Sequence, residues 1–292
     1  LLAPDVHLDQ SWLRAGFVFF TVGMATKMGL APLHTWKPDA YGEAPGAVGA
    51  LLAGSLTSVA FLAVMRGQQI MNAAGDGQTG RHTLLVFGVI SLAMAAISIV
   101  RQPDFKRTLA YSSVEHMGIL AIGVGVGGLA LFGVMLHLLV NSFTKGALFL
   151  TAANIHRAFG SRRYPDVQGA LRVLPVTAVL FLLGFLAISG TPPFGTFTSV
   201  FLIIREVFAR QPLAVGIVCL SFFAIAFAGM AVSALQITMG PAPSSHVPSR
   251  DRKTLVLPPA LLLGLVLMVG LVIPEPLRTL LTDAAALLEV AP

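Results

Sequence analysis

The sequence is organised around the segment Gly23-Met-Ala-Thr-Lys27-Met-Gly-Leu-Ala-Pro32-Leu-His34-Thr-Trp-Lys-Pro-Asp39-Ala-Tyr-Gly-Glu43-Ala-Pro45. Lys27 stands inside an otherwise apolar run, His34 follows seven residues later, and Pro32 between them removes a backbone donor and interrupts the helix. In a bilayer, a broken helix with a charged side chain must be buried in protein or line a hydrated cavity. Transporters build ion sites from such discontinuous helices, so the segment predicts a station on a proton or cation path.

The composition indicates a polytopic membrane protein. Of 292 residues, 55% are hydrophobic and 11% are charged, whereas soluble domains carry about 25% charged residues. The net charge of +6 comes from basic residues in short loops between apolar runs. These residues indicate membrane topology, and we expect no nucleic-acid partner. The single cysteine, Cys219, excludes a disulfide framework or a cysteine metal site within the chain.

Most of the apolar runs are long enough to span a membrane as helices, which takes about 20 residues. The runs lie at about 12–34, 46–65, 83–100, 108–127, 129–153, 173–190, 194–209, 212–239 and 255–273. Only Ser189 to Pro193 separates the sixth run from the seventh, so the two form either one discontinuous crossing or two crossings with a tight turn.

These runs predict an all-α membrane helix bundle with about 8–9 transmembrane segments, including discontinuous helices broken at Pro32, Pro192 and Pro193. Residues 1–292 are expected to form a single membrane domain that ends in a helix and tail over 255–292. Basic residues slightly favour the single broken crossing, and either topology places the loops 101–107 and 155–172 in the cytoplasm.

Ionisable residues inside the apolar runs are the candidate functional groups. Lys27 either lies on a buried path or extends to the interface as long side chains do. Glu115 and His116 are adjacent in the fourth run, where Tyr111 and Ser112 precede them by one helical turn. A carboxylate beside an imidazole inside a membrane is suited to proton relay, and the alternative is a hydrogen-bonded pair that fixes helix packing.

A second polar stripe lies in the fifth run, where His137, Asn141 and Lys145 are spaced four residues apart. The stripe must face the bundle interior, either as a hydrated proton path or as interhelical hydrogen bonding. Asp39 and Glu43, in the loop that also contains Lys37, pair with this lysine, cap the next helix or face a channel entrance. The sequence contains no metal-spaced cluster and no nucleophile–base set, so we expect neither catalytic residues nor a metal site in this chain.

Five segments together form a specific pattern. They are Lys27-Met-Gly-Leu-Ala-Pro-Leu-His34-Thr-Trp-Lys-Pro-Asp-Ala, Glu43-Ala-Pro45, Asp104-Phe-Lys-Arg-Thr-Leu-Ala-Tyr-Ser-Ser-Val-Glu115-His116-Met-Gly118, His137-Leu-Leu-Val-Asn141-Ser-Phe-Thr-Lys145-Gly-Ala-Leu-Phe-Leu150 and Gly190-Thr-Pro192-Pro193-Phe-Gly195. In this order, over about 15–240, the pattern resembles the antiporter-like, proton-translocating membrane subunits of respiratory complex I, Mrp cation/proton antiporters and group 4 hydrogenases. The Glu115-His116 form looks most like the hydrogenase-4 component F branch.

The resemblance implies the later part of a fold of about fourteen helices with two inverted repeats, each containing a broken helix. Lys27 would be the lysine of the first broken helix, and His137 and Lys145 would pass protons between two half-channels. The implied proton path consists of Lys27, His34, Glu115, His116, His137, Asn141 and Lys145. Iron–sulfur and nickel–iron or flavin centres are expected only in partner subunits, with no cofactor in this chain.

The resemblance also implies partners and a location. The chain would contact other membrane subunits and, through them, soluble redox subunits, and it would move protons or Na⁺ across the cell inner (plasma) membrane. The early helices, including one with a glutamate that pairs with Lys27, are expected outside this sequence. Val200 stands where relatives carry an acid or a lysine.

Three functions remain open at this stage. The first is a proton-translocating subunit of a hydrogenase-4-like or NADH dehydrogenase-like oxidoreductase complex. The second is a subunit of a Mrp-type cation/proton antiporter. The third is a truncated structural scaffold that no longer pumps, which Val200 favours.

Overall fold

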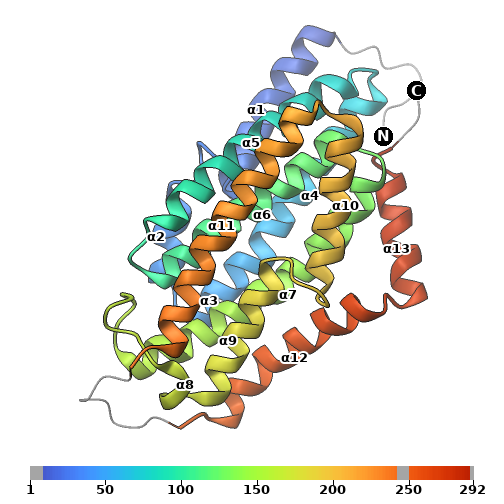
Figure 1. Ribbon diagram of the computed structural model, residues 1–292. Helices are drawn as coiled ribbons and strands as arrows, with labels where there is room; N and C mark the ends of the chain where they lie inside the picture. Colours follow the sequence, from blue (N-terminus) through green and yellow to red (C-terminus); the bar gives the residue numbers. More distant parts are fainter. Residues whose placement is uncertain (1–8, 242–249, 290–292) are drawn as a thin grey trace.

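The computed structural model describes residues 9–241 and 250–289, and its regular elements are helical apart from one isolated bridge between Asp104 and Arg163. The helices are α1 (Gln10–Met28), α2 (Trp36–Glu43), α3 (Gly46–Leu51), the π-helical η1 (Leu52–Leu56), α4 (Thr57–Ala73), α5 (Gly77–Val100), α6 (Phe105–Val126), α7 (Leu129–Phe159), α8 (Ala170–Val173), α9 (Pro175–Ile188), α10 (Gly195–Arg210), α11 (Leu213–Met239), α12 (Lys253–Leu271) and α13 (Glu275–Ala286). Figure 1 shows them packed side by side in an elongated bundle.

Six helices in the described ranges are long and apolar enough to cross a membrane. One of them is the continuous helix Gly46–Ala73, which comprises α3, η1 and α4. The others are α5, α6, α7, α11 and α12. Together with α1 and the shorter pair α9 and α10, they confirm the predicted all-α membrane bundle.

The helices α9 and α10 form one broken crossing alongside the long helix α7. Positions on the two helices meet α7 in antiparallel order: Gly184 packs on Leu148, and Gly195 packs on Val140 further along. The six residues between them contain the Pro192–Pro193 pair and Gly190, whose φ is +68°. The structure therefore favours the discontinuous crossing over two crossings with a tight turn.

The centre of the bundle is the antiparallel pair α6 and α7. Nearly all of α6 is buried, and it packs most extensively against α5. Glycines allow this approach: a Cβ added at Gly88 of α5 would lie 2.7 Å from the Gly118 carbonyl oxygen of α6. Small residues at such contacts let membrane helices pack closely, since lipid supplies no hydrophobic driving force between helices.

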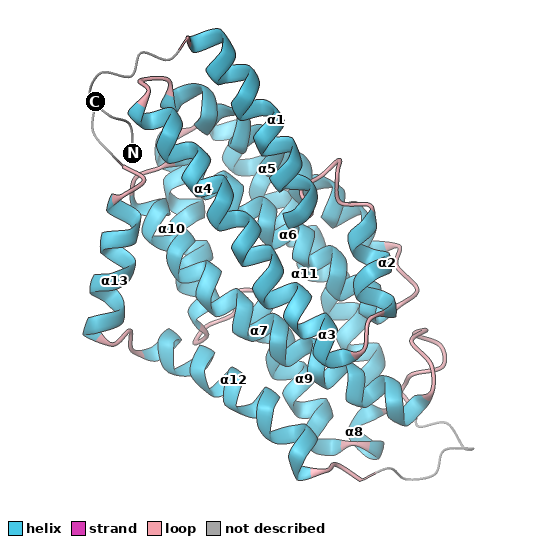
Figure 2. Ribbon diagram, turned by 180° about the vertical axis from the view of Figure 1, so that it is seen from behind, coloured by secondary structure: helices cyan, strands magenta, loops and turns pink. Residues whose placement is uncertain are grey.

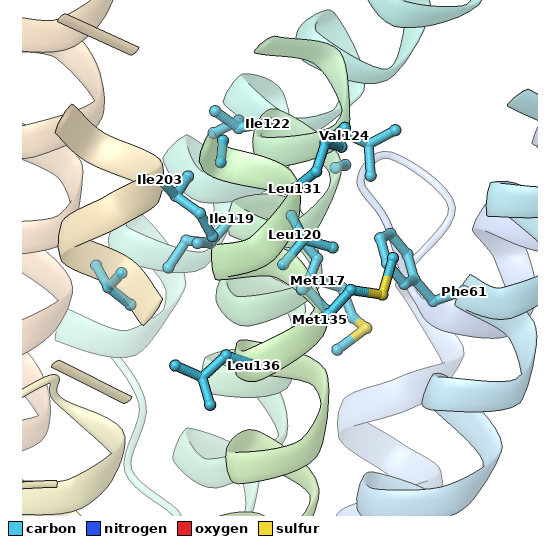
Figure 3. Close-up of a cluster of buried hydrophobic side chains, with 14 of the residues drawn as sticks. Phe61, Met117, Ile119, Leu120, Ile122, Val124, Leu131, Met135, Leu136 and Ile203 are labelled. Atoms are coloured by element: carbon cyan, nitrogen blue, oxygen red, sulfur yellow. The ribbon is translucent and has the colours of Figure 1, made fainter. Parts of the chain in front are cut away.

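Two apolar layers surround this central pair. Figure 3 shows one of them, in which Met117 and Leu120 of α6 pack with Met135 of α7 and Phe61 of α4. The view from behind in Figure 2 shows α12 and α13 on the outside of the bundle. The helix α12 contacts α7, α9 and α10, so it covers the break between α9 and α10.

The contact between α12 and this break gives a test of the fold. A Cβ added at Gly270 would lie 2.0 Å from the Pro193 carbonyl oxygen and 2.5 Å from the Gly195 nitrogen, so backbone must move. We expect Gly270→Ala to lower stability by about 1–3 kcal/mol. Gly264 lies on the same helix with nothing within 4 Å of its added Cβ, so Gly264→Ala is the matched control. Thermal unfolding in detergent measures both, and equal midpoints would contradict this packing.

Candidate functional site

The break after α1 exposes backbone carbonyls, which two side chains of the following segment then contact. Helix α1 ends at Met28, and Gly29 follows with a φ of +76°. Trp36 Nε1 donates to the Thr26 carbonyl at 2.6 Å, and Lys37 Nζ donates to the Met28 carbonyl at 2.7 Å. A cation at this position is stabilised by the negative end of the helix dipole. The predicted break at Pro32 is therefore present, in the turn between α1 and α2.

The structure places the two lysines at this break differently. Lys27 is exposed, whereas Lys37 is fully buried. The buried residues of α1 include Thr21 and Ala25, and Lys27 follows Ala25 by two positions, about 200° around the helix. In the described residues, Lys27 therefore points away from the bundle. Sequence reasoning assigned Lys37 to a loop, and its four-residue spacing from the buried Tyr41 was the available signal.

Lys145 occupies the centre of a buried polar cluster between α6 and α7. Its Nζ donates to the Leu109 carbonyl at 3.2 Å and makes a short hydrogen bond to Ser112 Oγ. Glu115 lies one turn further along α6, fully buried, and interacts electrostatically with Lys145. Lys37 also lies within electrostatic range of Lys145. The structure thus brings Glu115 and Lys145, from the two polar stripes of the sequence, into one buried cluster.

His116 continues this cluster toward α10. Its ring stacks on His137 with the ring centres 5.1 Å apart, and its Nδ1 lies 3.0 Å from His137 Nε2. On the far side of the ring, His137 Nδ1 lies 2.8 Å from Ser199 Oγ. Ser199 in turn donates to the Thr196 carbonyl at 2.9 Å. Ser199 lies in the first turns of α10 after the break. The sequence interpretation instead singled out the neighbouring Val200, as the position where relatives carry an acid or a lysine.

Several buried polar atoms in this cluster have no hydrogen-bond partner among the described residues. They are both carboxylate oxygens of Glu115, Nε2 of His116 and Oδ1 of Asn141. An unsatisfied buried polar group costs about 1–3 kcal/mol, and proteins satisfy such groups with ordered water. The cluster therefore has the chemistry of a hydrated site inside an apolar bundle.

The remaining candidates lie nearer the end of the bundle where α6 begins. His34 is buried, and its ring meets Tyr111 edge-on with the centres 6.1 Å apart. Asp39 and Glu43 are exposed. Arg107 forms a close ion pair with Asp39 at this rim.

Glu43 pairs with Arg162 at 2.9 Å, across 119 residues of sequence. The hydrogen bond and the charge of Arg162 lower the pKa of the Glu43 carboxyl below its ordinary value. Both acidic residues at the rim therefore contact arginines that are distant in the sequence. In the described ranges, no group of three or more His, Cys, Asp or Glu is arranged to hold a metal ion.

Most of the chain matches a known protein family. Residues 4–227 match the family described as NADH:quinone oxidoreductase/Mrp antiporter, transmembrane. The chain belongs to this family. The resemblance inferred from the five sequence segments is thereby confirmed.

Individual relatives show how much of a family member is present. The chain is 36% identical over 253 residues to a hydrogenase-4 component F homolog of Methylacidiphilum infernorum, covering 86% of this chain and 53% of that protein. It is 34% identical to subunit N of NADH-quinone oxidoreductase of Desulforudis audaxviator, covering 70% of this chain and 41% of that protein. The chain thus spans about half the length of the curated relatives it matches.

A solved structure supports the arrangement of the helices. The fold superposes on a chain of the Mrp complex from Dietzia sp. DQ12-45-1b with a TM-score of 0.85, covering 94% of this chain and 59% of that chain. The sequence identity is 21%, so this likeness establishes the shared fold alone.

The packing of Lys37 against Gly29 gives a stability test. Gly29 and Gly75 have nearly equal φ values of +76° and +77°, so alanine at either position incurs a left-handed strain of about 1–2 kcal/mol. A Cβ at Gly29 would also lie 2.5 Å from Lys37 Cδ, whereas one at Gly75 meets nothing within 4 Å. We expect Gly29→Ala to be the more destabilising, by about 1–3 kcal/mol.

A double-mutant cycle in detergent isolates the contact with Lys37. The double variant Gly29→Ala/Lys37→Ala should lose less unfolding free energy than the sum of the two single losses, by more than about 0.5 kcal/mol. Additive effects, or equal effects of Gly29→Ala and Gly75→Ala, would show that Lys37 does not pack over this break.

Proposed function

We propose that this chain is a proton-translocating membrane subunit of a hydrogenase-4-like or NADH dehydrogenase-like oxidoreductase complex. The observation that carries the proposal is one buried row of groups that accept and release protons. The row runs through Lys145, Glu115, His116, His137 and Ser199, each fully buried in the described part of the bundle.

The geometry of the histidines suits stepwise proton transfer. A neutral imidazole has one donor and one acceptor nitrogen, so it binds a proton on one side and releases it on the other. His137 has both nitrogens engaged, one with His116 and one with Ser199. Its two contacts therefore connect α6 to α10 through the ring. On the other side of His116, Glu115 and Lys145 form the next titratable pair, and Asn141 lies between Lys145 and His137 on α7.

The same groups favour protons over Na⁺ as the transported ion. Hard cations are held by several oxygen ligands, whereas this row is built mostly from nitrogen groups of one lysine and two histidines. A lysine ammonium repels a cation and exchanges a proton. We therefore assign proton movement to this chain, and transport should proceed without added Na⁺.

Redox chemistry is assigned to partner subunits. The two curated relatives are named as a hydrogenase component and an oxidoreductase subunit. In this proposal, iron–sulfur and nickel–iron or flavin centres lie in soluble partners, which neighbouring membrane subunits connect to this chain. Lys27 is exposed at the end of α1, and in this proposal it would contact such a neighbouring subunit.

We place the chain in the cell inner (plasma) membrane as a single multi-pass domain with the loops 101–107 and 155–172 in the cytoplasm. The two loops lie together, since Tyr164 donates to the Pro103 carbonyl at 3.1 Å. Contacts between early and late helices support one domain: Gln69 and Asn72 of α4 donate to the carbonyls of Leu287 and Leu288 after α13. Asp39 and Glu43 would then mark the cytoplasmic entrance.

One observation favours a second candidate function. Val200 is buried beside Ser199 and cannot carry a proton, as expected for a structural scaffold that has lost transport. A Mrp-type antiporter subunit remains the alternative among transporters, and dependence of proton uptake on a Na⁺ gradient would identify it.

The central test removes the buried ammonium. We expect Lys145→Ala to reduce proton uptake by vesicles containing the purified complex by about a hundredfold, the scale of a lost acid–base group. Lys253→Ala is the matched control, because Lys253 is exposed at the start of α12. Redox turnover with uncoupler is measured in parallel to show that the complex is assembled. Native uptake in the Lys145→Ala complex would reject the proposed function.

A further inference from the structure

We propose that the proton row leaves the bundle through Glu206, and that Ile203 forms an apolar gate between Ser199 and Glu206. This inference rests on the proposed function and adds the exit of the proton path. It concerns the part of α10 beyond Ser199.

The buried face of α10 aligns these residues. Thr196, Ser199, Ile203, Glu206 and Val207 are buried and follow one another at spacings typical of a single helix face. Seven residues separate Ser199 from Glu206, which is two helical turns or about 10 Å. Both side chains therefore lie on the surface of α10 that packs on α6 and α7.

Glu206 is a buried carboxylate close to the surface of the bundle. The residue is 6% exposed, and its Oε2 accepts a hydrogen bond from Arg210 Nε at 2.8 Å. Arg210 is half-exposed, so the ion pair connects the interior to the surroundings of the protein. A buried acid is rare unless it is paired, and such acids mark ion pathways in membrane proteins.

The turn between α6 and α7 shapes this exit. Arg210 lies over Gly128, where an added Cβ would come 2.3 Å from a guanidinium nitrogen. Arg81 lies over the neighbouring Gly127 in the same way, at 3.3 Å. Two arginines therefore flank the turn at the end of the bundle opposite the loop 101–107. The Arg210–Glu206 ion pair thus lies at this end of the bundle.

Ile203 fills the space between Ser199 and Glu206. It is fully buried, and added Cβ atoms at Gly123 of α6 and Gly133 of α7 would lie 3.3 and 3.2 Å from its Cγ1. Figure 3 shows Ile203 in the apolar cluster that also contains Ile119 and Leu131. An aliphatic side chain has no donor or acceptor, so the hydrogen-bonded row is interrupted here.

An interruption at this position has a physical purpose. A continuous row from one side of the membrane to the other would let protons flow back down their gradient. With Ile203 in place, a proton passes from Ser199 to Glu206 only when water enters between α10 and the pair α6–α7. Val200 is compatible with this exit, because the terminal acid lies about two turns further along α10.

Glu206→Gln in the intact complex tests the exit residue. Glutamine can still accept the Arg210 hydrogen bond but cannot exchange a proton, so we expect proton uptake to fall about tenfold or more. Glu206→Asp keeps a carboxylate and should retain a substantial part of the uptake. Glu275→Gln is the matched control, because Glu275 is exposed and pairs with Arg278 three residues later.

The outcomes separate this inference from the proposed function. Native uptake with Glu206→Gln, together with loss of uptake in Lys145→Ala, would overturn the exit and leave the proposed function intact. Equal losses with Glu206→Gln and Glu206→Asp would also overturn it, since the carboxylate would then act only through packing. Native uptake in both Glu206→Gln and Lys145→Ala would reject the proposed function itself.

Ile203→Ser tests the gate independently. The hydroxyl admits hydrogen bonding at this point, so vesicles holding the resting complex should lose an imposed pH gradient faster than native ones, by about tenfold. Ile203→Val keeps an aliphatic side chain and should retain the gradient. A native decay rate with Ile203→Ser in a complex with full redox turnover would overturn the gate.

Discussion

Lipid cannot solvate the ammonium group of Lys145, and the arrangement of the central helices follows from that constraint. The group is satisfied by the Leu109 carbonyl and Ser112 of α6, and the fully buried Glu115 lies one turn further along the same helix. Because all three come from one face of α6, the register between α6 and α7 is set by this contact. That register also brings His116 against His137 two turns away. One buried cation thus positions the remainder of the polar row.

The two helix breaks solve the same problem in different ways. The break after α1 frees a carbonyl, and Lys37 fills the position with a cation. The break before α10 instead changes where the helix face points, so that Ser199 meets His137. A continuous helix would satisfy its own carbonyls and keep one fixed face against α7. Proline and glycine at these points therefore create sites rather than merely weakening the helices.

The sequence predicts much of this arrangement because each helix in lipid must satisfy its own backbone hydrogen bonds. The spans follow from apolar length, both breaks follow from proline, and four-residue spacing predicts that each polar stripe faces the interior. The contact between the two stripes depends on the register of α6 against α7. The sequence does not predict which of Lys27 and Lys37 is buried. Helix α1 is apolar on most of its circumference, so its pattern does not reveal which face is buried. The Glu43–Arg162 contact joins loops 119 residues apart and depends on tertiary packing. The sequence does not predict a role for Ser199, because a single serine in a membrane helix does not by itself indicate a functional site.

The two ends of the polar row are separated from the surroundings of the bundle by different kinds of residue. This difference bears on how a neighbouring subunit would control transport. Toward the loop 101–107, charged residues such as Glu43 and Arg162 form an ion-paired rim that water reaches readily. Toward the turn at Gly127 and Gly128, an aliphatic side chain separates the row from the next carboxylate. In the proposed function, proton entry would therefore be governed by electrostatics, and proton exit would depend on a change in packing around α10. The break beside α10 leaves that helix joined to α9 by residues 189–194, which belong to neither helix. A neighbouring subunit that shifts α10 relative to α7 would therefore control release without disturbing Lys145 and its partners.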